Sequence, residues 1–116
     1  MSRLFSPIKL GEVELPNRIA VAPMCQYSAD DGCANDWHLQ HLSQLAYSGA
    51  GLVMLEAAAV ERRGRITHQD LGLYSDANEM ALAKVMTAVR RFALPGTRIG
   101  VQLAHAGRKA SSQRPW

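Results

Sequence analysis

Polar side chains of several kinds stand where the apolar runs of this sequence end. A thiol and a phenol, Cys25 and Tyr27, follow the first run, a carboxylate, Glu56, interrupts the second, and an amide and an imidazole, Gln102 and His105, close the third. If the runs are neighbouring parallel strands, these groups meet at one mouth, because the carboxyl ends of the strands lie together. A polar but weakly charged pocket of this kind can hydrogen-bond a flat heteroaromatic ligand.

The elements that would position these groups alternate between strands and helices. The apolar pattern predicts a hairpin over 8–15, a strand over 18–22, a helix starting at Asn35 or Asp36, a strand over 51–60, a helix capped by Ser75, and a strand over 98–104. The apolar stripe of the second helix is expected to run to Phe92. The runs 18–22 and 51–60 are nearly continuous, which is typical of strands buried on both faces in a parallel sheet.

This order, a hairpin followed by β-α-β-α-β, predicts an α/β fold with right-handed parallel crossovers. A complete (β/α)8 barrel takes about 250 residues, whereas this chain has 116. We therefore expect the N-terminal third of a TIM barrel, with residues 1–116 forming part of a single domain without an internal boundary. Exposed sheet edges would leave such a piece poorly stable alone.

The composition excludes several classes of protein. The chain is 47% hydrophobic and carries 13 Lys and Arg against 10 Asp and Glu, a net charge of +3, which is typical of a globular protein. Its cations are scattered rather than clustered, so we predict no nucleic-acid partner, and the densest run, 62–65, is expected to be a solvated loop. No stretch approaches the roughly 20 apolar residues of a membrane helix. No signal-peptide core is present, so we predict no membrane partner and a cytoplasmic protein.

Cysteine and histidine spacing predicts no disulfide framework and no metal site. Cys25 and Cys33 do not form C-x-x-C and are expected to be reduced thiols. His38 and His41 lack the spacing of zinc-protease motifs and are expected on a helix surface. Glu56, inside a buried strand, must be paired or hydrogen-bonded.

The loop after the third strand has two interpretations. His105, Arg108 and Lys109 could bind an anion or close a loop, or they could belong to a solvent-facing structural loop.

Five stretches of the sequence resemble the Old Yellow Enzyme family. They are PNRI at 16–19, VAPMCQY at 21–27, GLVMLEAAAV at 51–60, GRITHQDLGLYSD at 64–76 and IGVQLAHAGRKA at 99–110. The resemblance is closest to the branch with a cysteine beside the flavin, the xenobiotic-reductase-like and thermophilic-type ene-reductases. It implies an FMN-binding TIM-barrel domain that takes hydride from NADPH or NADH. The hydride would pass to an activated alkene such as an enone, a small electrophilic substrate, and the complete protein is expected to be a homo-oligomer.

The resemblance also implies which residues hold the cofactor. The positions that match flavin-contacting residues of the family are Ala22, Pro23, Met24, Cys25, Ala57 and Gln102. Gln102 matches the amide that hydrogen-bonds the pyrimidine portion of the flavin, and one acceptor with two donors suits that edge.

Two residues match positions closer to the reaction. Cys25 matches a thiol that modulates the flavin reduction potential, whereas most free cysteines are small buried hydrophobes. Tyr27 matches a tyrosine that meets the substrate, and its alternative role is a half-buried aromatic at the start of a loop.

The resemblance also implies what this chain lacks. In the family's order, the groups that grip the substrate's activating oxygen, donate the proton and hold the FMN phosphate come after position 116. The chain alone is therefore expected to be inactive, since preorganised donors supply much of the rate. The alternative is a non-catalytic truncated module, or a half-barrel that needs a partner chain.

Overall fold

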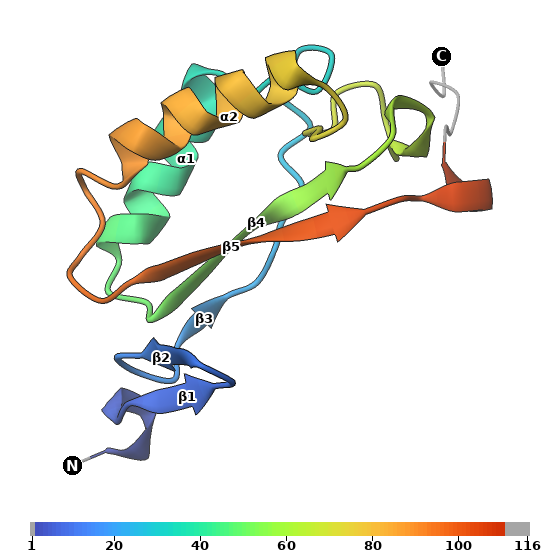
Figure 1. The fold of residues 1–116 in the computed structure, drawn as a ribbon. Coiled ribbons are helices and arrows are strands. Elements are labelled where there is room, and N and C mark those ends of the chain that lie inside the picture. Colours follow the sequence, from blue (N-terminus) through green and yellow to red (C-terminus); the bar gives the residue numbers. More distant parts are fainter. Residues whose placement is uncertain (1, 111–116) are drawn as a thin grey trace.

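The computed structural model describes residues 2–110, and its elements follow the predicted order (Figure 1). They are the 3-10 helix η1 (Arg3–Phe5), strands β1 (Ile8–Leu10), β2 (Val13–Leu15) and β3 (Ala20–Val21), helix α1 (Asp36–Tyr47), strand β4 (Leu52–Ala59), η2 (Arg62–Gly64), helix α2 (Asp76–Val89), strand β5 (Arg98–Ala104) and η3 (Gly107–Lys109). The two first strands form the antiparallel hairpin, with Ile8 opposite Leu15.

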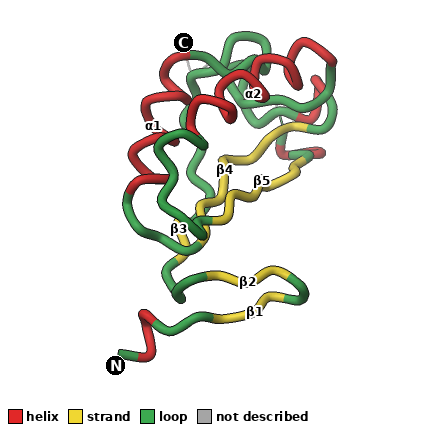
Figure 2. The backbone as a smooth tube through the Cα atoms, turned by 60° about the vertical axis from the view of Figure 1, so that its left-hand side comes forward, coloured by secondary structure: helices red, strands yellow, loops and turns green. Residues whose placement is uncertain are grey.

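The three later strands form one parallel sheet in the order β3-β4-β5. Figures 1 and 2 both place α1 and α2 on the same side of this sheet, with the hairpin beyond the N-terminal end of β3. A doubly wound fold would put helices on both faces and reverse the strand order. Successive strands with all helices on one face are instead the arrangement of a (β/α)8 barrel. The described residues form an open part of such a barrel.

The core lies between the helices and the sheet. Its buried members are Leu42, Ala46, Leu55, Ala58, Leu71, Leu82, Val85 and Val89. Ile99 and Val101 of β5 pack against it from the sheet. The other face of the sheet carries neither helix.

Local capping explains where the helices begin. Asn35 Oδ1 accepts a hydrogen bond from the N–H of Trp37 at 3.0 Å, and Ser75 Oγ accepts from the N–H of Asn78 at 3.2 Å. Asn and Ser are strong N-cap residues for this reason. The expectation for Phe92 was wrong, because α2 ends at Val89 and the chain then turns, leaving Phe92 55% exposed.

The expectation of a fully buried first strand was also wrong. Only Ala20 and Val21 pair in β3, and Ala20 is exposed, because β3 lies at an edge of the described sheet and pairs with β4 alone. The middle strand β4 is buried as predicted, with Val53 1% and Leu55 3% exposed.

Asn17 ties the start of β3 to the turn before β4. Its Nδ2 donates to the carbonyl of Gly49 at 2.8 Å, and its Oδ1 accepts from the N–H groups of Ile19 at 3.0 Å and Gly51 at 2.9 Å. Gly51 has no room for a side chain, since a Cβ there would lie 2.8 Å from the backbone oxygen of Asn17. This close approach sets the register between the two strands.

Candidate active site

The predicted site residues gather at the C-terminal ends of the three parallel strands. Gln102 of β5 is the register partner of Ala57 of β4. Cys25 lies beside Ala57, whose backbone acts to lower the pKa of the thiol. The phenol of Tyr27 lies close enough to this thiol for each group to shift the pKa of the other. The structure therefore brings together groups from three separate stretches of the chain.

Gln102 and Ala57 face away from the helices. Val101 packs against the helical core, and successive residues of a strand point to opposite faces, so Gln102 points to the open face, where it is exposed. Ala57 shares that face as its register partner. Ala57 is only 7% exposed, whereas the exposed amide of Gln102 can offer a flat ligand both a donor and an acceptor.

The Cys25 thiol is held in a partly buried position. Burial raises its pKa, the N–H of Ala57 works in the opposite direction, and the negative charges of Asp70 and Glu56 raise it further. The hydrogen bond from Tyr27 is the smallest contribution and favours the thiolate. Because the balance is a raised pKa, Cys25 is a neutral thiol at neutral pH and not an activated nucleophile.

Tyr27 has a strained backbone and a half-exposed ring. Its φ of 50° lies in the left-handed region, which costs a non-glycine residue about 1–3 kcal/mol and persists only where the surroundings enforce it. The side chain is 47% exposed, and the negative charge of the Cys25 thiolate is the main cause of its raised pKa. A half-exposed phenol beside the thiol is compatible with both predicted roles of Tyr27, contact with the substrate and a half-buried aromatic at the start of a loop.

Glu56 is buried at an irregularity of β4. The register with β5 shifts between Leu55 and Ala57, which leaves Glu56 outside the strand pairing. Its Oε2 accepts a hydrogen bond from the backbone N–H of Gln26 at 3.0 Å, and its Oε1 lies 3.4 Å from Nε2 of His38. The prediction that this carboxylate is hydrogen-bonded is confirmed.

The expectation of surface histidines was wrong for His38. It is 1% exposed, and its Nδ1 accepts from the N–H of Asn35 at 3.1 Å. The ring therefore turns inward and closes a capping box with Asn35 at the start of α1. His41 is partly buried, and this burial lowers its pKa.

The remaining predicted flavin contacts lie on the segment between β3 and Cys25. Ala22 is exposed, Pro23 is partly buried, and Met24 is 47% exposed. The Met24 carbonyl accepts from Nε2 of Gln26 at 2.9 Å, which shapes this segment locally. Its accessible side chains leave it available to line a ligand.

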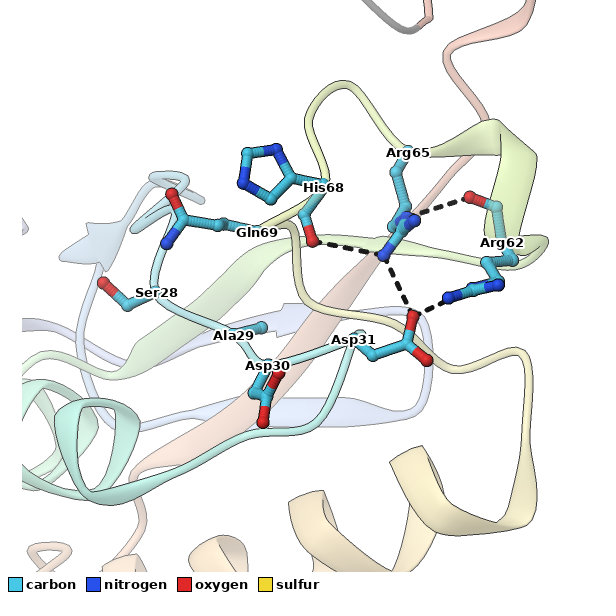
Figure 3. Close-up of a pocket in the computed structure, with 8 residues that line it drawn as sticks. All are labelled: Ser28, Ala29, Asp30, Asp31, Arg62, Arg65, His68 and Gln69. Carbon is cyan, nitrogen blue, oxygen red and sulfur yellow. Dashed lines mark hydrogen bonds and ion pairs between the residues drawn. The ribbon is translucent and has the colours of Figure 1, made fainter. Parts of the chain in front are cut away.

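A pocket beside this site was missed by the sequence reasoning (Figure 3). It is lined by Ser28, Ala29, Asp30, Asp31, Arg62, Arg65, His68 and Gln69. One of them, Asp31, accepts with its Oδ1 from Nε of Arg62 at 2.9 Å, Nη1 of Arg65 at 3.2 Å and the hydroxyl of Tyr74 at 3.2 Å. The hydrogen bond from Arg62 is the main reason why the pKa of Asp31 is lowered. These contacts join the loop after β3 to the loop after β4.

The predicted solvated loop over 62–65 is thus only partly solvated. The side chain of Arg63 is 85% exposed, but that of Arg65 is 16% exposed because it turns back to Asp31. The matched string at 64–76 was the one signal in the sequence that this loop has a fixed structure.

Of the two interpretations of the loop after β5, the structure favours loop closure. His105 Nδ1 accepts from the N–H of Gly107 at 3.0 Å, so its Nε2 carries the proton that faces Oε2 of Glu61 at 3.0 Å. This contact connects the loops after β4 and β5 and lowers the pKa of Glu61. Gly64 passes so close to the His105 ring that a Cβ there would lie 2.5 Å from a ring carbon.

Both cysteines are free thiols, as predicted. Within residues 2–110, no three His, Cys, Asp or Glu side chains gather in a group that could hold a metal ion. None of the helices in the described part of the chain has the length and apolar character needed to cross a membrane.

Comparison with known proteins gives consistent matches along the whole chain. An NADH:flavin oxidoreductase of Gibberella zeae is 48% identical over 115 residues, covering 99% of this chain and 27% of the relative. An NADPH dehydrogenase of Listeria monocytogenes is 49% identical over 112 residues, covering 95% of this chain and 32% of the relative. The chain therefore spans about a third or less of these curated relatives.

Solved structures agree with this result. Morphinone reductase in complex with tetrahydroNAD superposes with a TM-score of 0.81 at 30% identity, over 95% of this chain and 29% of that chain. Old Yellow Enzymes are also among the similar structures, which confirms the predicted resemblance and the partial TIM-barrel fold. The family indicates FMN and NAD(P)H as cofactors. With a family model matching residues 3–115, the chain belongs to the NADH:flavin oxidoreductase / NADH oxidase family.

Proposed function

We propose that the complete protein is an FMN-dependent NAD(P)H oxidoreductase that reduces the activated C=C bond of enones or similar electrophiles. The observation that carries the proposal is the meeting of Cys25, Tyr27, Ala57 and Gln102 at the C-terminal ends of three barrel strands. This is the end at which TIM barrels place their active sites. The reduction of an enone is supported by the name of a similar protein, morphinone reductase.

The open face of the sheet fits one side of a flavin. The exposed amide of Gln102 supplies a donor and an acceptor for a polar ring edge, and Ala57, its register partner on β4, adds no polar group of its own beside it. The segment Ala22–Cys25 would line the ring from the first strand. FMN, when bound, supplies hydride transfer between the nicotinamide and the alkene, which no side chain of this chain can perform.

The chain's own residues orient the reactants and set the polarity around them. The neutral thiol of Cys25 would tune the electron affinity of the ring beside it without adding a charge, because its raised pKa keeps it protonated. Tyr27, beside this thiol, presents a half-exposed phenol that would contact the substrate. Residues 1–116 would then form the N-terminal wall of a single FMN-binding barrel domain, inactive by itself.

The test is to load the full-length protein with FMN and follow NADPH oxidation with and without 2-cyclohexenone. We expect a yellow protein that consumes NADPH faster when the enone is present. A protein that stays colourless after FMN addition contradicts the flavin site. A yellow protein whose NADPH oxidation under anaerobic conditions does not respond to the enone contradicts the substrate class only.

A further inference from the structure

Glu56 is fixed at two points, and one of them is the backbone between Cys25 and Tyr27. Its carboxylate accepts from the N–H of Gln26 at 3.0 Å and lies 3.4 Å from Nε2 of His38. The Glu56 and His38 side chains are only 5% and 1% exposed. A carboxylate buried to this extent is costly unless it is paired, so both contacts constrain where it lies.

The protonation pattern of His38 makes a carboxylate the suitable neighbour. The N–H of Asn35 donates to Nδ1, so the neutral ring carries its proton on Nε2. Nε2 is buried and has no partner of hydrogen-bonding geometry among the described residues. The Glu56 carboxylate, whose Oε1 lies 3.4 Å from Nε2, is therefore the acceptor group that faces this donor.

The same segment is also held from the start of α1. Nδ2 of Asn35 donates to the carbonyl of Ser28 at 2.6 Å, and Nε1 of Trp37 donates to Oε1 of Gln26 at 3.1 Å. Between these anchors lies Tyr27 with its left-handed backbone. A conformation of this kind needs surroundings that enforce it, and Glu56 is the anchor that comes from the sheet.

We propose that Glu56 is a positioning residue that places the Cys25 sulfur and the Tyr27 hydroxyl through the backbone of Gln26. The inference rests on the proposed function, since it assumes that these two side chains face the flavin and the substrate. In this role Glu56 acts by fixing the Gln26 peptide, which joins Cys25 to Tyr27.

Replacement of Glu56 by glutamine tests this with almost no change of shape. The carboxylate faces two donors, since its Oε2 accepts from the N–H of Gln26 at 3.0 Å and its Oε1 lies 3.4 Å from Nε2 of His38. A glutamine side chain would accept from one of them and turn its NH2 group toward the other, donor against donor. In either orientation one pair of donors repels, so the side chain should be displaced, and the Gln26 peptide and Cys25 should shift with it.

The experiment measures the flavin midpoint potential of the full-length, FMN-loaded protein as wild type, Glu56→Gln, Cys25→Ser and the double variant. We expect Glu56→Gln and Cys25→Ser to shift the potential in the same direction. The double variant should match Cys25→Ser alone, because Glu56 acts through the thiol. We also expect kcat/KM for the enone to fall by up to about 100-fold, the size of effect that a 1 Å misplacement produces.

Glu79→Gln is the matched control, since Glu79 is an exposed glutamate of α2, and it should leave the potential unchanged. An unshifted potential in Glu56→Gln or in Cys25→Ser overturns the inference, and so do additive shifts in the double variant. If neither Glu56→Gln nor Glu56→Asp gives a folded flavoprotein, Glu56 is a stability residue and the positioning role fails. A wild-type protein that binds no FMN overturns the proposed function instead.

Discussion

Replacing Asn17 by alanine should loosen the junction between β3 and β4. Three hydrogen bonds are lost, but the N–H of Gly51 retains the carbonyl of Ile19 at 3.0 Å. Two backbone groups, the N–H of Ile19 and the carbonyl of Gly49, therefore lose the Asn17 side chain as partner. At a net value of about 1 kcal/mol per bond, and somewhat more for a partly buried group left unpaired, the cost is about 2–3 kcal/mol.

The assay is urea unfolding of the full-length protein together with amide hydrogen exchange of the peptide that contains Ile19. Exchange should accelerate there because the Ile19 N–H loses its acceptor at 3.0 Å. Gln44→Ala, on an exposed position of α1, is the control and should change stability by less than about 0.5 kcal/mol. An effect of Asn17→Ala as small as the control's would refute the reasoning.

Asn17→Asp removes the hydrogen-bond donor of the Asn17 side chain, Nδ2, and keeps its acceptor, Oδ1. The substitution keeps the oxygen that accepts from Ile19 and Gly51 but places a carboxylate oxygen where Nδ2 now lies, 2.8 Å from the Gly49 carbonyl. Two acceptors then face each other, which raises the pKa of the introduced carboxyl in the folded state. The stability of the variant relative to wild type should therefore be highest at low pH, where this carboxyl is protonated, and should fall as pH rises through its raised pKa. A variant with the same stability relative to wild type at pH 4 and pH 7 would contradict this.

Three further predictions concern the site and its loops. Burial raises the pKa of Cys25, so iodoacetamide should alkylate it slowly at pH 7 and faster as pH rises, as followed by mass spectrometry. Rapid labelling at pH 7 would count against a protonated thiol. Gly64→Ala should lower Tm, since its Cβ would lie 2.5 Å from the His105 ring. Adding His105→Ala should recover most of this Tm, and a Gly64→Ala effect of equal size with and without the His105 side chain would refute the clash. Asp31→Ala should speed hydrogen exchange in the loop after β4. In the wild type, faster exchange in this loop should appear only when pH falls below the ordinary titration range of aspartate, because the hydrogen bond from Arg62 lowers the pKa of Asp31. Exchange that responds neither to Asp31→Ala nor to acid would contradict the role of Asp31 in holding the loop.

The sequence by itself determined the order of the elements and most of their limits. The strand over 98–104 was predicted with the limits that β5 has, and Asn35 and Ser75 cap the two helices as expected. These features depend on neighbours within a few residues, on periodicity and on side chains that bond the adjacent backbone. The apolar runs are equally local, and they predicted Cys25 and Gln102 near the ends of strands.

The tertiary structure alone decided which side chains meet. His38 turns inward because Glu56 lies beneath the start of α1. The side chain of Arg65 is largely buried because it donates to Asp31, which is 34 residues away in the sequence but adjacent in space. The Glu56 bond to Gln26 likewise joins groups 30 residues apart. Local sequence could not reveal these pairs. A buried charge must be paired or hydrogen-bonded, and the packing of the helices on the sheet determines which groups lie within a few ångströms of it.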